Sequence, residues 1–160
     1  MPRLEVLDPE SQEFIRSYQC REGGAPAWVP LNKPLSDCKV ALITSSGLIR
    51  RGDRPFDLSN PGGDSSFRVI PSNSDPSELT LSIVSTNWDR TGFMADVNVI
   101  FPMERLRELA EEKVIGSLAE EFYAFMGSIF EVDPVIERSA PEVGRRLKEA
   151  RVDVALLVPV

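Results

Sequence analysis

The sequence predicts an α/β fold: a single domain in which a small, mainly parallel sheet is flanked by helices. Two observations predict it. Apolar runs of strand length, at 38–44, 79–85 and 152–160, are separated by stretches with helical spacing of apolar residues. The last run, VDVALLVPV, is apolar after Asp153, which is typical of a strand covered on both faces. We therefore expect 152–160 to be a buried, central strand.

Ahead of the sheet, residues 1–35 are expected to form an N-terminal helix and a proline-rich extended arm. Asp8 can cap the helix, Pro9 suits its first turn, and Gly23 with Gly24 would end it. The arm holds prolines at 26, 30 and 34, which disfavour a packed element. The α/β domain proper is then expected over 36–160.

Between the loops and the final strand, several helical segments are expected. Pro102 begins one, whose apolar side holds Met103, Leu106 and Leu109 at helical spacing. A second apolar stripe follows at Leu118, Phe122 and Phe125, and such a stripe belongs to a core far more often than to a cofactor site. Two helix starts come next, at Asp133-Pro134 and at 139–142, where Ser139 and Glu142 fit a capping box.

The charge balance limits the partners of this chain. The formal net charge is −7, and the one dense basic spot, at 50–54, is short. An acidic chain of this kind argues against a nucleic-acid partner and against binding to an anionic membrane. No apolar run approaches the roughly 20 residues of a membrane span, and the acidic N-terminus does not resemble a signal peptide. We expect a soluble, cytoplasmic protein.

Histidine is absent, and the two cysteines, Cys20 and Cys38, are 18 positions apart. This excludes the usual Ser-His-Asp and Cys-His catalysis, and the spacing fits neither a C-x-x-C redox pair nor a zinc site. No metal is expected. Two reduced, partly buried thiols are the ordinary interpretation.

A small polar turn follows the first strand, and it holds the first candidate binding residues, Thr44, Ser45 and Ser46. A turn after a buried strand can present amides and hydroxyls to an anion or a carboxylate, and the chemistry of open α/β sheets lies beyond the carboxyl ends of their strands. An ordinary turn that ends a strand is the alternative.

The segment 48–67 has no periodicity and carries several prolines, glycines and acids. Irregular loops of this length are uncommon inside a compact domain and are usually functional or disordered. Because Phe56, Leu58 and Phe67 supply apolar anchors, we expect an ordered covering loop. Its candidate substrate-binding residues are Asp57, Asn60 and Asp64.

A second loop, behind the predicted strand 79–85, combines several polar chemistries with two aromatic residues. By the same strand-end argument it belongs on the face where Ser45 lies. Its candidates are Asn87, Asp89, Arg90 and Thr91. A well-capped surface loop is the alternative, and an Asp–Arg ion pair must be weighed against a substrate carboxylate held by Arg90.

Five runs of the sequence resemble one known family. They are KVALITSSGL, FDLSNPGGDSSFRVIP, NWDRTGF, DVNVIFPMERLRELAEEKVIGSLAEEFYAFMG and APEVGRRLKEARVDVALLVPV. Together they resemble the selenoprotein B subunits of glycine, sarcosine and betaine reductase and of D-proline reductase. The resemblance covers roughly 33–160 and implies an α/β reductase-like domain.

In that family the strand that resembles 152–160 leads into a selenocysteine or cysteine, followed by further cysteines. The resemblance implies an oxidoreductase in which the selenolate attacks the substrate, or a Schiff base on a partner subunit, and a C–N bond is cleaved reductively. It implies no other cofactor, a small amino-acid-like or quaternary-amine substrate, and a partner reductase subunit or a homo-oligomer. The loops around Ser45, Asp57 and Asp89 are expected to converge on Val160, with the catalytic residue just after it.

The 160 residues contain no residue in that position, and three accounts stay open: a UGA codon read as selenocysteine, a natural short homologue, or a truncation. The first is favoured because the break falls where the redox residue would come. The chain as given is then expected to be inactive. Two other functions compete with a reductase domain: a non-catalytic module that binds a small ligand or a subunit, and a thiol redox protein that uses Cys20 and Cys38.

Overall fold

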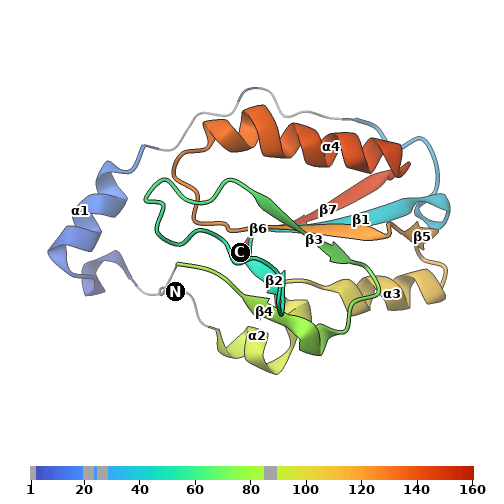
Figure 1. Cartoon of the computed structure of the whole chain (residues 1–160), viewed down its shortest axis with the longest axis horizontal. Coiled ribbons are helices and arrows are strands. Elements are labelled where there is room, and N and C mark those ends of the chain that lie inside the picture. The colour runs from blue at the N-terminus through green and yellow to red at the C-terminus, as the bar shows by residue number, and fades with distance from the viewer. Residues whose placement is uncertain (1–2, 20–23, 25–28, 85–89) are drawn as a thin grey trace. The chain divides into compact units, whose positions relative to one another are not determined.

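The computed structural model describes residues 3–19, 24, 29–84 and 90–160 of the 160-residue chain. It divides the chain into two units, Met1–Pro30 and Leu31–Val160 (Figure 1). Of the described residues, those that bury their side chains all belong to the second unit. The hydrophobic core that positions the site is therefore built by Leu31–Val160.

The N-terminal unit holds a 3-10 turn, Leu4–Val6, and helix α1, Pro9–Ser17. Asp8 caps α1 as predicted, because its carboxylate accepts a hydrogen bond from the Ser11 amide at 2.9 Å. The helix ends earlier than predicted. Tyr18 is already extended, so Gly23 and Gly24 do not terminate it.

The predicted α/β class is confirmed. The main sheet contains β1 (Lys39–Thr44), β3 (Phe67–Pro71), β5 (Ser117–Leu118), β6 (Glu121–Phe125) and β7 (Val154–Val158). β1 pairs in parallel with β5, β6 and β7, and β3 closes one side antiparallel to β6. The sheet is thus mixed but mostly parallel, with β1 at its centre and its apolar side chains buried.

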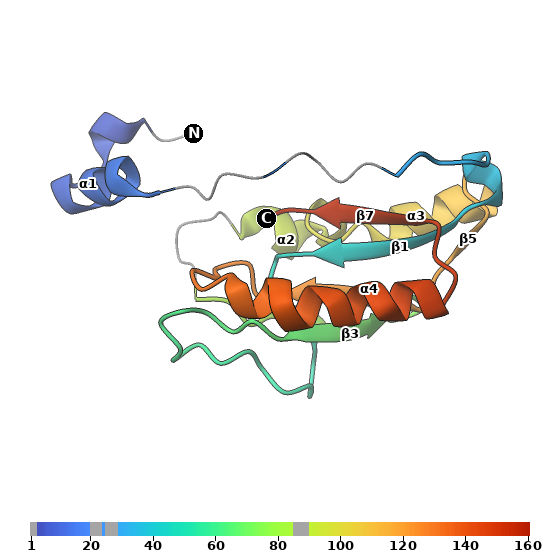
Figure 2. The same cartoon turned by 90° about the horizontal axis from the view of Figure 1, so that it is seen from above.

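The prediction that 152–160 is buried on both faces and central was wrong. β7 pairs with β1 along its whole length, Val40 with Val154 through Thr44 with Val158, but it lies at an edge of the sheet. Figure 2 shows it beside β1, away from β3. Leu156 is 39% exposed and Leu157 is 66% exposed. An apolar run therefore predicted the strand but not its place in the sheet.

The second predicted helical stripe was also wrong. Leu118 ends β5, and Phe122 and Phe125 lie in β6. Three consecutive residues of β6, Phe122, Tyr123 and Ala124, are buried. A strand that is covered on both faces has no polar alternation, so a short apolar run cannot be told from a buried helix by its period.

The segment 79–85 contributes only a short strand, and not to the main sheet. β4, Leu79–Leu81, pairs antiparallel with β2, Leu48–Arg50, in a separate two-stranded sheet. β2 lies within the segment expected to lack structure. The loop after β4 was expected near Ser45 because both would follow strands of one parallel sheet. Since β4 does not belong to that sheet, this reason no longer applies.

Helices cover both faces of the main sheet, with α4 on one side and α3 on the other (Figure 1). The remaining elements are short helical turns, at Leu35–Asp37, Pro76–Glu78 and Val97–Val99, together with α2 (Thr91–Ala95), α3 (Met103–Glu111), a π-helical turn (Val135–Ser139) and α4 (Ala140–Glu149). The helix from Pro102 is thus confirmed.

The predicted capping box at the start of α4 is absent. Ser139 has helical backbone angles, since the π-helical turn runs directly into α4. Its hydroxyl instead donates to the carbonyl of Ser65 in the long loop. On α4, Val143 is buried while Arg145 is exposed, as the apolar spacing predicts.

The main core lies between the sheet and α3. Leu42, Phe122 and Phe101 are among its fully buried members, and Phe101 packs edge-on against Phe122 with ring centroids 5.9 Å apart. A smaller cluster joins Ile49, Phe56 and Met126. Among the described residues, no helix is long and apolar enough to cross a membrane.

Candidate functional site

The carboxyl ends of β1 and β7 meet at Ser45. The Ser45 amide donates to the carbonyl of Val158 at 3.2 Å, and the Val160 amide donates to Ser45 Oγ at 3.0 Å. Parallel pairing of the two strands causes this, because it brings their carboxyl ends to the same edge of the sheet. Ser45 therefore lies beside Val160, as the sequence predicts.

Two glycines allow the backbone of the turn after β1 to approach the end of β6 closely. Gly127 has a φ of +88°, and a Cβ built on it would lie 2.0 Å from the Ser45 carbonyl oxygen. Gly47, with a φ of +69°, donates its amide to the Phe125 carbonyl at 2.8 Å. The turn after β1 is thus held against the end of β6 by main-chain contacts.

Thr44 and Ser46 are buried and face inward. The Thr44 hydroxyl donates to the carbonyl of Ile100 at 2.9 Å and accepts the amide of Ser46 at 3.2 Å. The Ser46 hydroxyl has no hydrogen-bond partner within the described part of the chain. Of the three candidates in this turn, Ser45 alone presents its side chain toward Val160.

An apolar cavity of about 670 Å³ lies between α4 and the sheet, at the same edge. Ser45, Pro159 and Gly127 line it beside the strand ends, and α4 and β7 contribute Val143, Leu147, Ala155 and Leu157. None of the lining residues is charged. Such a lining accepts an apolar group and offers no charged partner to a carboxylate or an ammonium ion.

The sequence analysis did not predict this cavity. Phe125 reaches it from β6, which the periodicity assigned to a helix, and Leu157 reaches it from a strand that was expected to be covered. Both are apolar residues in runs that look like core. No sequence signal separates a cavity wall from a packed core.

The three acidic and amide candidates of the long loop shape the loop itself. Asp57 accepts the amide of Ser59 at 3.0 Å, Asn60 accepts that of Gly62 at 3.0 Å, and Asp64 accepts that of Ser66 at 2.8 Å. These are Asx turns, in which the side chain takes the place of a backbone acceptor. Asp64 also accepts the Asp57 amide at 2.8 Å, which joins two of the turns.

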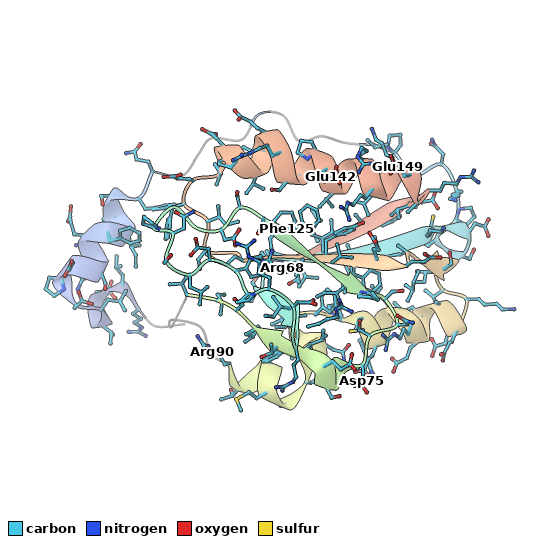
Figure 3. All side chains as sticks on the ribbon, in the orientation of Figure 1. Arg68, Asp75, Arg90, Phe125, Glu142 and Glu149 are labelled. Carbon is cyan, nitrogen blue, oxygen red and sulfur yellow. The ribbon has the colours of Figure 1, made fainter. Side chains whose placement is uncertain are left out.

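Arg68, on β3, holds the loop from the sheet side (Figure 3). It donates to the carbonyls of Arg54 and Pro55 at 2.8 and 2.9 Å. Its guanidinium lies 4.1 Å from the ring centroid of Phe56 and pairs with Asp64 at 3.7 Å. The loop is ordered, as predicted, because the partly buried Arg68 cation satisfies several of its polar groups.

The carboxyl groups of Asp57 and Asp64 are held in the ionised form. Burial opposes ionisation of Asp64, but the hydrogen bonds from Ser66 and from the Asp57 amide and the charge of Arg68 lower its pKa. Hydrogen bonds from the hydroxyl and the amide of Ser59 lower the pKa of Asp57. Both groups therefore act as acceptors rather than as proton donors.

Asp57, Asn60 and Asp64 line a polar cavity of their own, separate from the one beside Ser45. The segment after Gly127 lies between them: the Gly62 carbonyl accepts the amide of Phe130 at 3.0 Å. The loop thus lies near the edge that Ser45 occupies without presenting its carboxylates there.

The last group of candidates is only partly described. Asn87 and Asp89 lie outside the described residues. Arg90 precedes α2 and Thr91 begins it (Figure 3). Neither lines the cavity between α4 and the sheet.

The thiol of Cys38 is buried and lies before β1, at the end opposite to Ser45. Its Sγ donates to the Pro34 carbonyl at 3.2 Å. Cys20 lies outside the described residues. No group of three potential metal ligands occurs in the part of the chain that the structure describes.

Comparison with known proteins decides the family. The model of the glycine/sarcosine/betaine reductase selenoprotein B family matches residues 11–159. The chain belongs to this selenoprotein B family. The match includes β1, the long loop and β7, and it ends at residue 159, one residue before Val160.

Curated members of the selenoprotein B family are similar to this chain. It is 37% identical over 132 residues to the D-proline reductase subunit gamma of Acetoanaerobium sticklandii, a match that covers 82% of this chain and 52% of that protein. It is 30% identical over 132 residues to the glycine reductase complex component B subunit gamma of Symbiobacterium thermophilum. That match covers 81% of this chain and 30% of that protein.

A shorter match, 27% identical over 99 residues, covers 62% of this chain and 23% of the sarcosine reductase complex component B subunit beta of Peptoclostridium acidaminophilum. The chain thus spans about half the length of the D-proline reductase relative and less of the others. No solved structure is significantly similar to it.

Proposed function

We propose that this chain is the substrate-facing domain of a multi-subunit reductase, which cleaves a C–N bond in a small amine of the glycine, sarcosine, betaine or D-proline class. The observation that carries the proposal is the 3.0 Å hydrogen bond between the Val160 amide and Ser45 Oγ. It joins the carboxyl ends of two parallel strands, where open α/β sheets bind their ligands. The relatives' names, each a reductase subunit, support it.

The proposed redox residue is a selenocysteine or cysteine directly after Val160. When present, it supplies a nucleophile that is ionised at neutral pH, and a neighbouring cysteine resolves its oxidised form. The Ser45 hydroxyl, which already binds the Val160 amide, would hold that position in place. The uncharged cavity would receive the apolar part of the substrate. The charged groups of the substrate would then be bound by the loop 85–91 or by a partner subunit.

Cys38 is buried at the wrong end of β1, and a buried thiol in an apolar setting is a poor nucleophile. The same burial argues against the thiol redox function that would use Cys20 and Cys38.

The test begins with the DNA after the Val160 codon. We expect a UGA codon followed by an open frame that encodes cysteines. The extended protein, made with selenocysteine at that codon, is then assayed with a dithiol and its partner subunits for reductive cleavage of a C–N bond in each of the four substrate classes. A matched variant with serine at the codon controls for activity that does not depend on the redox residue.

Either of two outcomes would contradict the proposal: a TAA or TAG codon after Val160, or an extended selenoprotein that reduces none of the substrates in the presence of its partner subunits.

The second candidate function is a non-catalytic module that binds a small ligand or a subunit. The internal hydrogen bonds of Asp57, Asn60 and Asp64 favour its subunit-binding form, because acceptors that are already engaged are poor ligands for a small molecule. A genuine stop after Val160, together with binding of a partner reductase subunit measured by calorimetry, would select this function.

A further inference from the structure

The polar cavity of the long loop has charges of both signs in its lining. Its volume is about 380 Å³, and its charged lining residues are Arg54, Arg68, Asp57 and Asp64. All the residues that line it lie within 54–68, so the cavity is built by one described stretch of the chain. Arg68 anchors this stretch to β3, and Figure 2 shows the loop beside β3 and away from β7. The cavity is therefore independent of the edge at which β7 ends.

Several polar groups in this lining already have partners within the loop. Asp64 uses both of its carboxylate oxygens as acceptors. Asn60 donates through its amide group and accepts through its carbonyl oxygen. Arg68 donates to main-chain carbonyls on both sides of its guanidinium. These three side chains form the wall of the cavity and have little hydrogen-bonding capacity left for a ligand.

Two charged groups of the lining are not engaged in this way. Within the described part of the chain, the Arg54 guanidinium makes no hydrogen bond and no ion pair. Asp57 accepts both hydrogen bonds from Ser59 on Oδ1, and no described residue donates to its Oδ2. Both side chains belong to exposed residues, so a ligand can reach them from solvent.

The two groups lie near each other without forming an ion pair. Hydrogen bonds from Ser59 lower the pKa of Asp57, and the charge of Arg54 lowers it further. Asp57 is therefore ionised at neutral pH, and an arginine is always charged. A cation and an anion that are close but not in contact can each bind the opposite charge of one small molecule.

We propose that this cavity binds a zwitterionic amino acid, whose carboxylate contacts the Arg54 guanidinium and whose ammonium group donates to Asp57 Oδ2. A guanidinium is a planar, bidentate donor that matches a carboxylate, and an ionised carboxylate is a strong acceptor for an ammonium group. The volume of the cavity lies in the range of small-molecule sites, so it leaves room for a side chain or for bridging water.

The charge balance of the lining selects a zwitterion as the ligand. Two arginines and two aspartates give the cavity a formal charge of zero. A lone anion would meet two carboxylates, and a lone cation would meet two guanidinium groups. A ligand with one charge of each sign avoids both conflicts.

This site is separate from the substrate position proposed beside Ser45. The connection after β6 lies between them, because the Gly62 carbonyl accepts the amides of Phe130 and Glu131, each at 3.0 Å. The same connection contributes Ile129 to the wall of the apolar cavity. A ligand that joins Arg54 to Asp57 would hold the loop against this connection without touching the redox position. Binding here does not require the proposed reaction.

Nuclear magnetic resonance of the isotope-labelled full chain tests the ligand class. Titration with glycine is expected to shift the amide signals of residues 54–66 in a saturable way, with a dissociation constant in the millimolar range. Acetate carries only the carboxylate and methylammonium only the cation, so neither should give a saturable shift. Betaine keeps both charges but has no N–H to donate, and it should bind more weakly than glycine.

Two variants that each remove one charge test the residues. Arg54→Gln removes the partner of the carboxylate, and Asp57→Asn removes the negative charge but keeps an oxygen that can accept from Ser59. Each should weaken glycine binding by about tenfold or more, because a charge-assisted hydrogen bond is lost. Arg105→Gln and Glu108→Gln are the matched controls. They remove the same charges from an exposed pair on α3 and should leave the affinity unchanged.

The spectra also show whether each variant is folded, and the ligand series uses the native chain, so a variant that does not fold leaves the proposal testable. The absence of a saturable shift with glycine, equal binding of acetate or methylammonium, or equal affinity in the folded variants at Arg54 and Asp57 would overturn it. Glycine-induced shifts confined to Ser45 and Gly127 would do so as well. No turnover enters these measurements, so their outcome is independent of the proposed function.

Discussion

At the scale of the residue, the carboxyl edge of the sheet depends on glycine. Gly127 lies where the turn after β1 meets the end of β6, and its missing side chain leaves room for the Ser45 carbonyl. The same contact positions Ser45 for its hydrogen bond to Val160. One glycine thus supports the point at which the two parallel strands end.

We predict that Gly127→Ala lowers the free energy of unfolding by about 2 kcal/mol or more, because the new Cβ would meet backbone at 2.0 Å in a left-handed conformation. Urea denaturation measures it. Gly144→Ala is the matched control: a Cβ there meets nothing within 4 Å, and alanine in a helix should stabilise by up to about 1 kcal/mol. Equal effects at the two glycines would contradict the packing described here.

At the scale of the element, the long loop is folded by its own carboxylates and by Arg68. Asp64 is the acceptor that links the loop to β3, since it receives two amides and pairs with the Arg68 guanidinium. Its side chain is only 15% exposed, so the ion pair is poorly screened. The order of this segment therefore depends on charge, although its sequence shows no periodicity.

Stability should depend on the charge of Asp64 in acid. Its folded-state pKa lies below the usual value, so the contribution of the ionised group is present above the unfolded pKa and is lost as the pH falls through the folded one. We predict that Asp64→Asn lowers the free energy of unfolding at pH 7 by about 1–3 kcal/mol. The difference from the native protein should shrink below about pH 4.

Urea denaturation at pH 7 and pH 3 measures this. Glu108→Gln, which removes an exposed pair with Arg105, serves as the control and should change stability by less than about 1 kcal/mol at either pH. A loss at Asp64→Asn that is the same at both pH values would show that charge is not the cause.

At the scale of the whole molecule, the fold is centred on β1. Among the described strands, it alone pairs in parallel with strands on both of its sides, and its consecutive residues Val40, Ala41 and Leu42 are all buried. β7, by contrast, has one neighbour and exposed apolar residues. The molecule is therefore packed around the first strand of the sequence and open at the last.

We predict that Leu42→Ala, in β1, lowers the free energy of unfolding by about 2–5 kcal/mol, because the side chain is fully buried and its removal leaves a cavity. Met94→Ala, at a residue that is 81% exposed, should change it by less than about 0.5 kcal/mol. Chemical denaturation gives both values. If the two substitutions had similar effects, the core would not lie against β1.

The sequence by itself determined the family, the α/β class, β1, α3, the Asp8 cap and the meeting of Ser45 with Val160. Each follows from local chemistry or from parallel pairing, and a single apolar run, a capping residue or a motif carries that information. Only the tertiary structure decided that β6 is a strand, that β4 belongs to another sheet, that β7 is an edge, and that an uncharged cavity lies beneath α4. An apolar run indicates that burial of a segment is favourable. Which elements cover the segment depends on contacts with residues that are distant in the sequence. For 152–160, this is why the sequence predicted the strand while its exposed outer edge emerged only from the fold.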